Sequence, residues 1–129
     1  MRLFTQTVLV TIEHLDENKH VNNVQFLTWI QEISRAHWST IAPKEVVDNY
    51  VWVVRNHNIT YHKSAFLDDK LKLVTQISKW KGPLCWRKVE IIDSKSNNIL
   101  VSALTEWCML ERKSMKPKRI HEHLIELFS

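Results

Sequence analysis

The feature that most restricts the fold of this chain is an apolar helical pattern across residues 23–41. Apolar side chains recur there at intervals of three and four residues and cover more than a narrow stripe. They are Val24, Phe26, Leu27, Trp29, Ile30, Ile33, Trp38 and Ile41. Asn22 or Asn23 can cap the N-terminus, and Pro43 stops the helix just beyond Ala42. A helix with so wide an apolar surface has to be buried on most sides.

Extended stretches lie on both sides of this helix. β-Branched residues mark a first strand at residues 7–12. Four more stretches follow at about residues 51–63, 70–81, 84–93 and 99–112, with turn-like sequences at 64–69, 82–83 and 94–98 between them. Because these connections are short, we expect the strands to be antiparallel neighbours.

Local pattern also predicts how the strands face each other. In the 70–81 stretch one side is apolar and is typical of a buried strand face, formed by Leu71, Leu73, Thr75 and Ile77. A hairpin centred near Ser96 would place Cys85 roughly opposite Cys108 and Trp86 roughly opposite Trp107. We expect the tryptophan pair to be structural.

The order of these elements defines a fold class. After Pro117, an amphipathic pattern predicts a short closing helix with Ile120, Leu124 and Leu127 on its apolar side. One strand, a long buried helix, four antiparallel strands and a short helix together predict an α+β fold, in which a curved antiparallel sheet of about five strands wraps the long helix. This pattern is shared by hotdog and cystatin-like folds and does not separate them.

The composition is that of an ordinary globular protein, with 44% hydrophobic and 25% charged residues among 129. We therefore expect one domain spanning residues 1–129. No apolar run reaches the roughly 20 residues that cross a bilayer, and no signal-peptide core follows Met1, so we expect a cytoplasmic protein without a membrane span. Cys85 and Cys108 fit no zinc or redox spacing and predict reduced, packed thiols. We expect no metal and no cofactor.

The formal charge of +4 favours partners that carry phosphate or acidic groups. The basic residues are scattered and match no recognised nucleic-acid module, so we expect no nucleic-acid partner and keep nucleic-acid binding as a weak alternative. Five basic residues could contact such phosphates or form a solvated strand edge, namely Lys63, Lys79, Lys81, Arg87 and Lys88.

Residues 14–23 gather reactive side chains immediately before the long helix. Asp16 supplies a carboxylate, His20 an imidazole, and Asn18, Asn22 and Asn23 supply amides. Backbone N–H groups at a helix start carry partial positive charge and can bind an oxyanion as it forms on a carbonyl. Thioester hydrolysis needs such a site together with a base or nucleophile. Asp16 could activate water or attack the carbonyl itself, while Asn18 and His20 position the water and hydrogen-bond the thioester.

Two segments resemble known hotdog thioesterases. Residues 15–32 closely resemble the signature Asp-x-Asn-x-His-Val-Asn-Asn-x-x-Tyr-x-x-Trp-x-x-Glu of the acyl-ACP thioesterases, with Phe26 at the tyrosine, and they also resemble the 4-hydroxybenzoyl-CoA thioesterase group. Residues 61–71 are similar to the segment Tyr-x-x-Pro-Ala-x-x-Gly-Asp-x-Leu of that group, with Ser64 at the proline and Asp68 at the glycine.

The resemblance implies a hotdog fold and the hydrolysis of an acyl thioester carried by coenzyme A or acyl carrier protein. It implies catalytic roles for Asp16, Asn18 and His20. An oxyanion and substrate-binding set is implied at Asn22, Asn23, Phe26, Tyr61, Ser64 and Ala65. The plant enzymes carry a further catalytic glutamate where this chain has Ser64, which leaves Asp16 as the leading carboxylate. A homo-oligomer, either a dimer or a tetramer built as a dimer of dimers, is implied as well, with sheets paired and each site built across the interface.

Other interpretations of the loop stay open. Asp16 and Asn18 could form only turn hydrogen bonds, and Asn22 or Asn23 could only cap the helix. His14, Asp16 and His20 could ligate a metal, although no Cys or His cluster supports them. The same fold could serve a hydratase or dehydratase, which releases no thiol, or a non-catalytic acyl-CoA-binding module.

Overall fold

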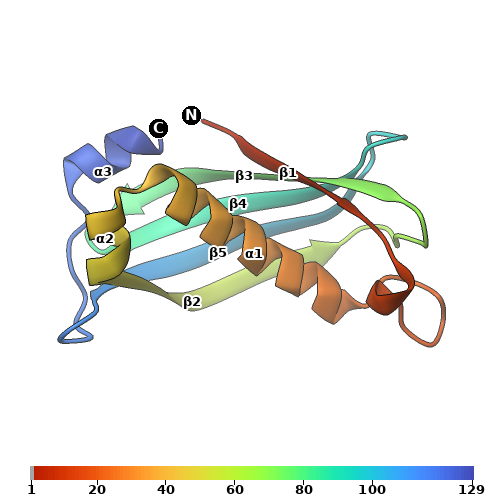
Figure 1. The fold of residues 1–129 in the computed structure, drawn as a ribbon, viewed down its shortest axis with the longest axis horizontal. Coiled ribbons are helices and arrows are strands. Elements are labelled where there is room, and N and C mark those ends of the chain that lie inside the picture. Colours follow the sequence, from red (N-terminus) through yellow and green to blue (C-terminus); the bar gives the residue numbers. More distant parts are fainter. Residues whose placement is uncertain (1) are drawn as a thin grey trace.

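A five-stranded antiparallel sheet curves around one long helix in the computed structural model, which describes residues 2–129 (Figure 1). The elements are β1 (Phe4–Leu9), the 3₁₀ turn η1 (Ile12–His14), α1 (Asn23–Ile41), α2 (Lys44–Asn49), β2 (Tyr50–Tyr61), β3 (Lys70–Lys81), β4 (Leu84–Asp93), β5 (Ile99–Glu111) and α3 (Glu122–Leu127). The strand order is β1-β3-β4-β5-β2, so β1 and β2 are the edges. Figure 1 shows α1 lying across one face of the sheet, with α2 and α3 at its C-terminal end. The expected α+β architecture is confirmed.

The helix α1 buries the broad face that its spacing predicted. Asn22 caps the helix, because its side-chain Oδ1 accepts a hydrogen bond from the N–H of Val24 at 2.9 Å. The buried residues are Phe26, Trp29, Ile30, Ile33, Ser34 and His37. Burial of each large apolar side chain contributes on the order of 2 kcal/mol to stability. Val24 is 68% exposed beside the loop, so burial covers one wide face rather than most sides.

The core forms two clusters along α1. The first surrounds the N-terminal half of the helix and contains Phe26 and Ile30 together with Leu71 and Leu73 of β3. The second surrounds its C-terminal end and contains Ile77 and Phe128. Phe128 stacks on Trp38 with ring centroids 5.8 Å apart, so the segment at the end of α3 closes this side of the core. The predicted closing helix and the predicted buried face of residues 70–81 are both confirmed.

Two local features differ from the expectation. β1 spans Phe4–Leu9 rather than residues 7–12. Its last pair joins Leu9 to Lys70, the first residue of β3, and Val10 then bonds to Asp68 and Asp69 of the preceding turn. The short helix α2 was not predicted. Its six residues make fewer than two turns, which is too short a segment for an apolar period to show.

The register of the β4–β5 hairpin was predicted wrongly by one residue. Cys85 pairs with Trp107, and Trp86 pairs with Glu106. The cause is the position of the turn: Ile92 pairs with Ile99, so the hairpin is centred between Lys95 and Ser96, two residues out of the expected register. A bulge in β5 at Leu100, between the partners of Ile92 and Ile91, then shifts the remaining pairs by one residue and halves the difference. The expected tryptophan pair is therefore absent, and Trp86 instead lies 4.8 Å below the ammonium group of Lys79 on the neighbouring strand.

Candidate active site

The loop between η1 and α1 is held closed by backbone hydrogen bonds. The N–H of Asp16 donates to the carbonyl of His20 at 2.8 Å. Lys19 turns the chain back with a φ of 63°, in the left-handed region. The N–H of Val21 donates to the carbonyl of Ala65 at 2.9 Å, which ties the loop to the segment before β3. The predicted catalytic residues therefore lie on a short, braced loop.

One oxygen of the Asp16 carboxylate anchors this loop. Oδ1 accepts hydrogen bonds from the backbone N–H groups of Asn18 at 2.9 Å and His20 at 3.2 Å. Oδ2 accepts none from residues 2–129, and neither does the side chain of Asn18 form one within that range. Asp16 therefore forms the turn hydrogen bonds considered above, but only through Oδ1. The other carboxylate oxygen of this half-buried side chain is available to take a proton from water.

The fold brings His20 and Ser64 together although 44 positions separate them in the sequence. The Ser64 hydroxyl oxygen lies 3.4 Å from Nδ1 of the imidazole. The ring of Phe66 packs edge-on against the same imidazole, with centroids 5.0 Å apart. These two contacts orient the ring, while Nε2 has no hydrogen-bond partner among the described residues.

The start of α1 offers one free backbone N–H group. The N–H groups of residues 22, 24, 25 and 26 all have acceptors, which are the carbonyl of His14 and the side-chain and backbone oxygens of Asn22. The N–H of Asn23 has no acceptor within residues 2–129. It lies at the positive end of a 19-residue helix, where a donor stabilises developing negative charge. The candidate oxyanion donor is therefore the backbone of Asn23, and Asn22 is the cap.

Three further predicted residues lie beneath or beside the loop. The side chains of Phe26 and Ala65 are buried in the core, so they support the loop from below. Tyr61, at the end of β2, is 42% exposed, and its ring centroid lies 6.2 Å from that of Phe26. Among these three, Tyr61 is the residue with a side chain at the surface.

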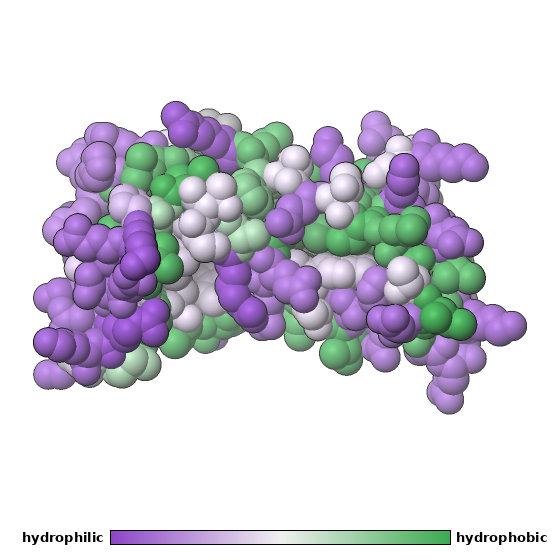
Figure 2. Space-filling view, in the orientation of Figure 1, coloured by the Kyte–Doolittle hydropathy of each residue, from purple (hydrophilic) through white to green (hydrophobic). Residues whose placement is uncertain are grey.

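Exposed apolar side chains border the loop. They are Ile12, Val24, Phe66 and Leu67, with exposed fractions between 47% and 75%. Figure 2 shows hydrophobic residues at the surface near this end of the molecule, between projecting hydrophilic ones. The polar groups of the loop thus open onto an apolar rim, which suits the acyl part of a thioester.

Sequence interpretation missed a polar cluster under the C-terminal half of α1. Arg87, considered above as a surface contact for phosphate, is only 5% exposed. Its Nη1 donates to Nδ1 of His37 at 2.8 Å and to Oγ1 of Thr75 at 2.9 Å. The alternation of β4 could have revealed the burial of Arg87, because it places this residue on the same buried face as Cys85 and Val89.

Burial controls the charge state of this cluster. Burial, together with the neighbouring Arg87 charge, lowers the pKa of His37 to about 4, so the imidazole is neutral at pH 7. Burial lowers the pKa of Arg87 to about 10, which leaves the guanidinium charged. Burial also raises the pKa of Cys85 to about 12, so this thiol stays protonated and is no nucleophile.

The metal alternative finds no geometric support at the loop. Nδ1 of His14 accepts a hydrogen bond from the N–H of Thr11 at 3.0 Å, and the ring packs edge-on against Trp29 with centroids 4.9 Å apart. Within residues 2–129, no three His, Cys, Asp or Glu side chains are grouped so that they could hold a metal ion. None of the helices in the same range is long and apolar enough to cross a membrane.

Known proteins resemble this chain in sequence and in fold. The family model of the acyl-ACP thioesterase N-terminal domain matches residues 1–128. The long-chain acyl-CoA thioesterase FadM of Escherichia coli is 26% identical over 118 residues, which cover 88% of this chain and 87% of FadM. The structure of YbaW, a probable thioesterase from Escherichia coli, aligns with a TM-score of 0.82 at 24% identity and covers 95% of this chain and 94% of that one. The 12:0-ACP thioesterase of Umbellularia californica aligns with a TM-score of 0.82 at 14% identity and covers 96% of this chain but 48% of its own. The chain therefore belongs to the acyl-ACP thioesterase N-terminal domain family and has the hotdog fold of the thioesterases.

Proposed function

We propose that the loop from Asp16 to Asn23 carries the hydrolysis of acyl thioesters by this thioesterase. One arrangement supports the proposal: residues 16–23 hold an oriented imidazole together with a carboxylate oxygen and a helix-start N–H that have no hydrogen-bond partner among residues 2–129. A water molecule held by Asp16 and His20 would face a carbonyl carbon whose oxygen is bound by the N–H of Asn23.

The proposed reaction proceeds by general base catalysis. Oδ2 of Asp16 takes a proton from water while the water oxygen bonds to the thioester carbon. The negative charge that develops on the carbonyl oxygen is stabilised by the N–H of Asn23. The C–S bond then breaks, the proton on Asp16 passes to the departing thiolate, and a carboxylic acid and a free thiol are released. Asn18 and His20 position the water and the thioester.

The proposed substrate is an acyl group on coenzyme A or acyl carrier protein. The relative FadM is named for long-chain acyl-CoA, and the Umbellularia californica protein is named for 12:0-ACP. Both carriers are anionic, which agrees with the formal charge of +4. The apolar rim of the loop favours an apolar acyl group.

We further propose that residues 1–129 act as one domain that pairs with a second copy through β2. This strand is twelve residues long and lies at a sheet edge, where unpaired backbone groups can extend the sheet into a partner. Antiparallel pairing would set the start of one β2 beside the end of the other. Because Tyr61 ends β2 close to the loop, each site would lie at the interface. Assembly into tetramers and the cytoplasmic location remain predictions.

The test is a thiol-release assay on acyl-CoAs from short to long, one aromatic acyl-CoA and an acyl-ACP. We expect Asp16→Asn to lower kcat about 10²- to 10⁴-fold. Glu17→Gln is the matched control, because it neutralises the adjacent exposed carboxylate of the same loop and should keep full activity. Wild-type turnover in a folded Asp16→Asn protein would contradict the mechanism. A protein that acyl-CoA stabilises without any thiol release would favour the binding module.

A further inference from the structure

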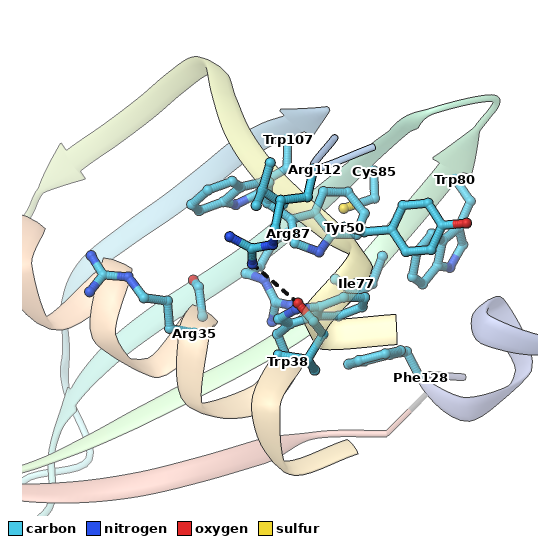
Figure 3. Close-up of a pocket in the computed structure, with 14 residues that line it drawn as sticks. Arg35, Trp38, Tyr50, Ile77, Trp80, Cys85, Arg87, Trp107, Arg112 and Phe128 are labelled. Atoms are coloured by element: carbon cyan, nitrogen blue, oxygen red, sulfur yellow. Dashed lines mark hydrogen bonds between the residues drawn. The ribbon is translucent and has the colours of Figure 1, made fainter. Parts of the chain in front are cut away.

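A cavity of about 250 Å³ lies at the C-terminal end of α1, away from the loop that carries Asp16 (Figure 3). Its walls are largely aromatic and contain four of the six tryptophans of the chain, Trp38, Trp52, Trp80 and Trp107, together with Tyr50 and Phe128. Figure 3 shows how three elements contribute to these walls, with Trp38 on α1, Trp80 and Trp107 on the sheet, and Phe128 in the C-terminal segment. Such walls suit the apolar body of a small organic molecule.

The charged residues of this cavity all have the same sign. Arg35, Arg87 and Arg112 line it, and no Asp or Glu of the described chain does. Arg112 lines the cavity, and its guanidinium forms two hydrogen bonds. Nε donates to the carbonyl of Asp48 at 2.7 Å, and Nη2 donates to the carbonyl of Val47 at 3.3 Å. The second of these bonds is the dashed line in Figure 3. These partners are neutral, so they orient the guanidinium without cancelling its charge.

Arg87 is the most deeply buried of the three arginines. Its described partners, His37 and Thr75, are neutral, and they share the single donor atom Nη1. No ion pair among residues 2–129 includes Arg87. A buried guanidinium with only neutral partners is costly, and an anion between its remaining donors would relieve that cost.

A second donor in the cavity wall lacks an acceptor. Nε1 of Trp107 is buried and forms no hydrogen bond within the described residues. Buried polar groups nearly always have a partner, which is either protein, water or ligand. The cavity therefore combines unfilled hydrogen-bond donors, positive charge and aromatic walls.

We propose that this cavity binds the carboxylate of a small organic acid, with the carboxylate between Arg87 and Arg112 and the apolar body against the tryptophans. Planar guanidinium groups match carboxylates in geometry and charge. The volume of about 250 Å³ is below the roughly 300–1,000 Å³ of sites for drug-sized ligands, so the body is one ring or a short chain.

Such a carboxylate can come from two sources. It can be a second carboxylate at the far end of the acyl group, or it can belong to a free acid, such as a reaction product. The first source rests on the proposed function. In the proposed antiparallel β2 pairing, Tyr50 and Trp52 at the start of one strand lie beside the end of the partner strand, so the cavity would open toward the catalytic loop of the other subunit.

Ligand binding is tested first, without reference to turnover. Phenylacetate is titrated against phenylacetamide, its uncharged analogue, with tryptophan fluorescence and the thermal midpoint as readouts. We expect phenylacetate to quench fluorescence and raise the midpoint, and phenylacetamide to do neither. Arg112→Gln should weaken phenylacetate binding about tenfold or more, since it removes a charged hydrogen-bond donor at the cavity opening. Arg119→Gln, an exposed arginine outside the cavity, should leave binding unchanged.

Further measurements distinguish the two sources of the carboxylate and require that the variants are folded. Asp16→Asn should bind phenylacetate like wild type, so a failure of the hydrolytic mechanism would not alter this result. A higher kcat/KM for adipoyl-CoA than for hexanoyl-CoA, abolished by Arg112→Gln, assigns the site to the acyl group. Phenylacetate binding without that preference assigns it to a free acid. Equal affinity for acid and amide, or an unchanged affinity in folded Arg112→Gln, would overturn the proposal.

Discussion

The guanidinium of Arg87 donates to Nδ1 of His37 across 2.8 Å, and this contact makes the buried imidazole a neutral acceptor. Phe4 stacks on the same ring with centroids 4.9 Å apart, and Phe128 packs edge-on at 4.8 Å. A positive charge on this imidazole would face another positive charge inside an aromatic cage. The stability of the fold therefore depends on the protonation state of His37.

Stability should fall on acidification through this histidine. The folded pKa of His37 is about 4, below the ordinary 6.5, so between these values the unfolded chain binds a proton that the folded chain does not. The contribution of His37 to the free energy of unfolding is complete above pH 6.5. It declines as the pH falls toward 4, by at most about 3 kcal/mol. Burial lowers the pKa of His57 as well, which adds a loss of the same sign.

Urea unfolding at pH 7.5, 6.0 and 5.0 measures this dependence. His37→Asn keeps an acceptor for Arg87 but cannot be protonated, so its stability should fall less steeply between pH 6.5 and 5 than that of wild type. Parallel slopes for the two proteins would show that His37 does not contribute.

The proposed oxyanion donor, the backbone N–H of Asn23, can be removed by substitution with proline. Asn23→Pro deletes the one N–H at the helix start that lacks an acceptor within residues 2–129, and proline is favoured at the first position of a helix. The preceding residue Asn22 has φ −65° and ψ 136°, which a following proline permits. We expect a folded protein whose kcat is lowered about 10²- to 10³-fold.

Asn23→Ala provides the control for that change. It removes the side chain and keeps the N–H, so its kcat should stay close to the wild-type value. Similar losses in both variants would assign the role to the side chain, and full activity in Asn23→Pro would exclude this N–H as the oxyanion donor.

His20 and Ser64 should be coupled in catalysis. Because Oγ of Ser64 lies 3.4 Å from Nδ1 of the imidazole, Ser64→Ala should lower kcat several-fold in wild type and have little further effect in His20→Ala. A double-mutant cycle of the thiol-release rate measures this coupling. Additive losses would mean that the serine acts independently of the imidazole.

The β2 edge should control assembly. Val53 lies on this edge strand and is 38% exposed, and a carboxylate in the strand would oppose pairing with a like-charged copy. We expect Val53→Glu to convert dimers to monomers in sedimentation velocity and to reduce thiol release in parallel. Leu9→Glu changes an exposed residue on the opposite edge strand, β1, and should do neither. A dimeric Val53→Glu protein would place the interface elsewhere.

The sequence by itself determined the elements whose cause is local. The period of apolar residues across α1, the asparagine at its start and the proline after it define that helix, and alternation marks the buried face of β3. The loop motif identified the thioesterase family for the same reason, because its residues are adjacent in the chain. Expectations of this kind were confirmed, apart from boundaries at β1 and the short helix α2.

Only the tertiary structure decided the features that depend on distant residues. A one-residue bulge in β5 shifted every pair of the hairpin beyond Ile92, and a local pattern cannot reveal it. Hydrogen bonds between the loop and the segment before β3 brought His20 to Ser64. Packing of α1 on β4 buried Arg87 beside His37 and left a cavity next to it. Side-chain periodicity indicates which face of an element is buried, but the residues it meets there depend on strand register and on how the layers pack.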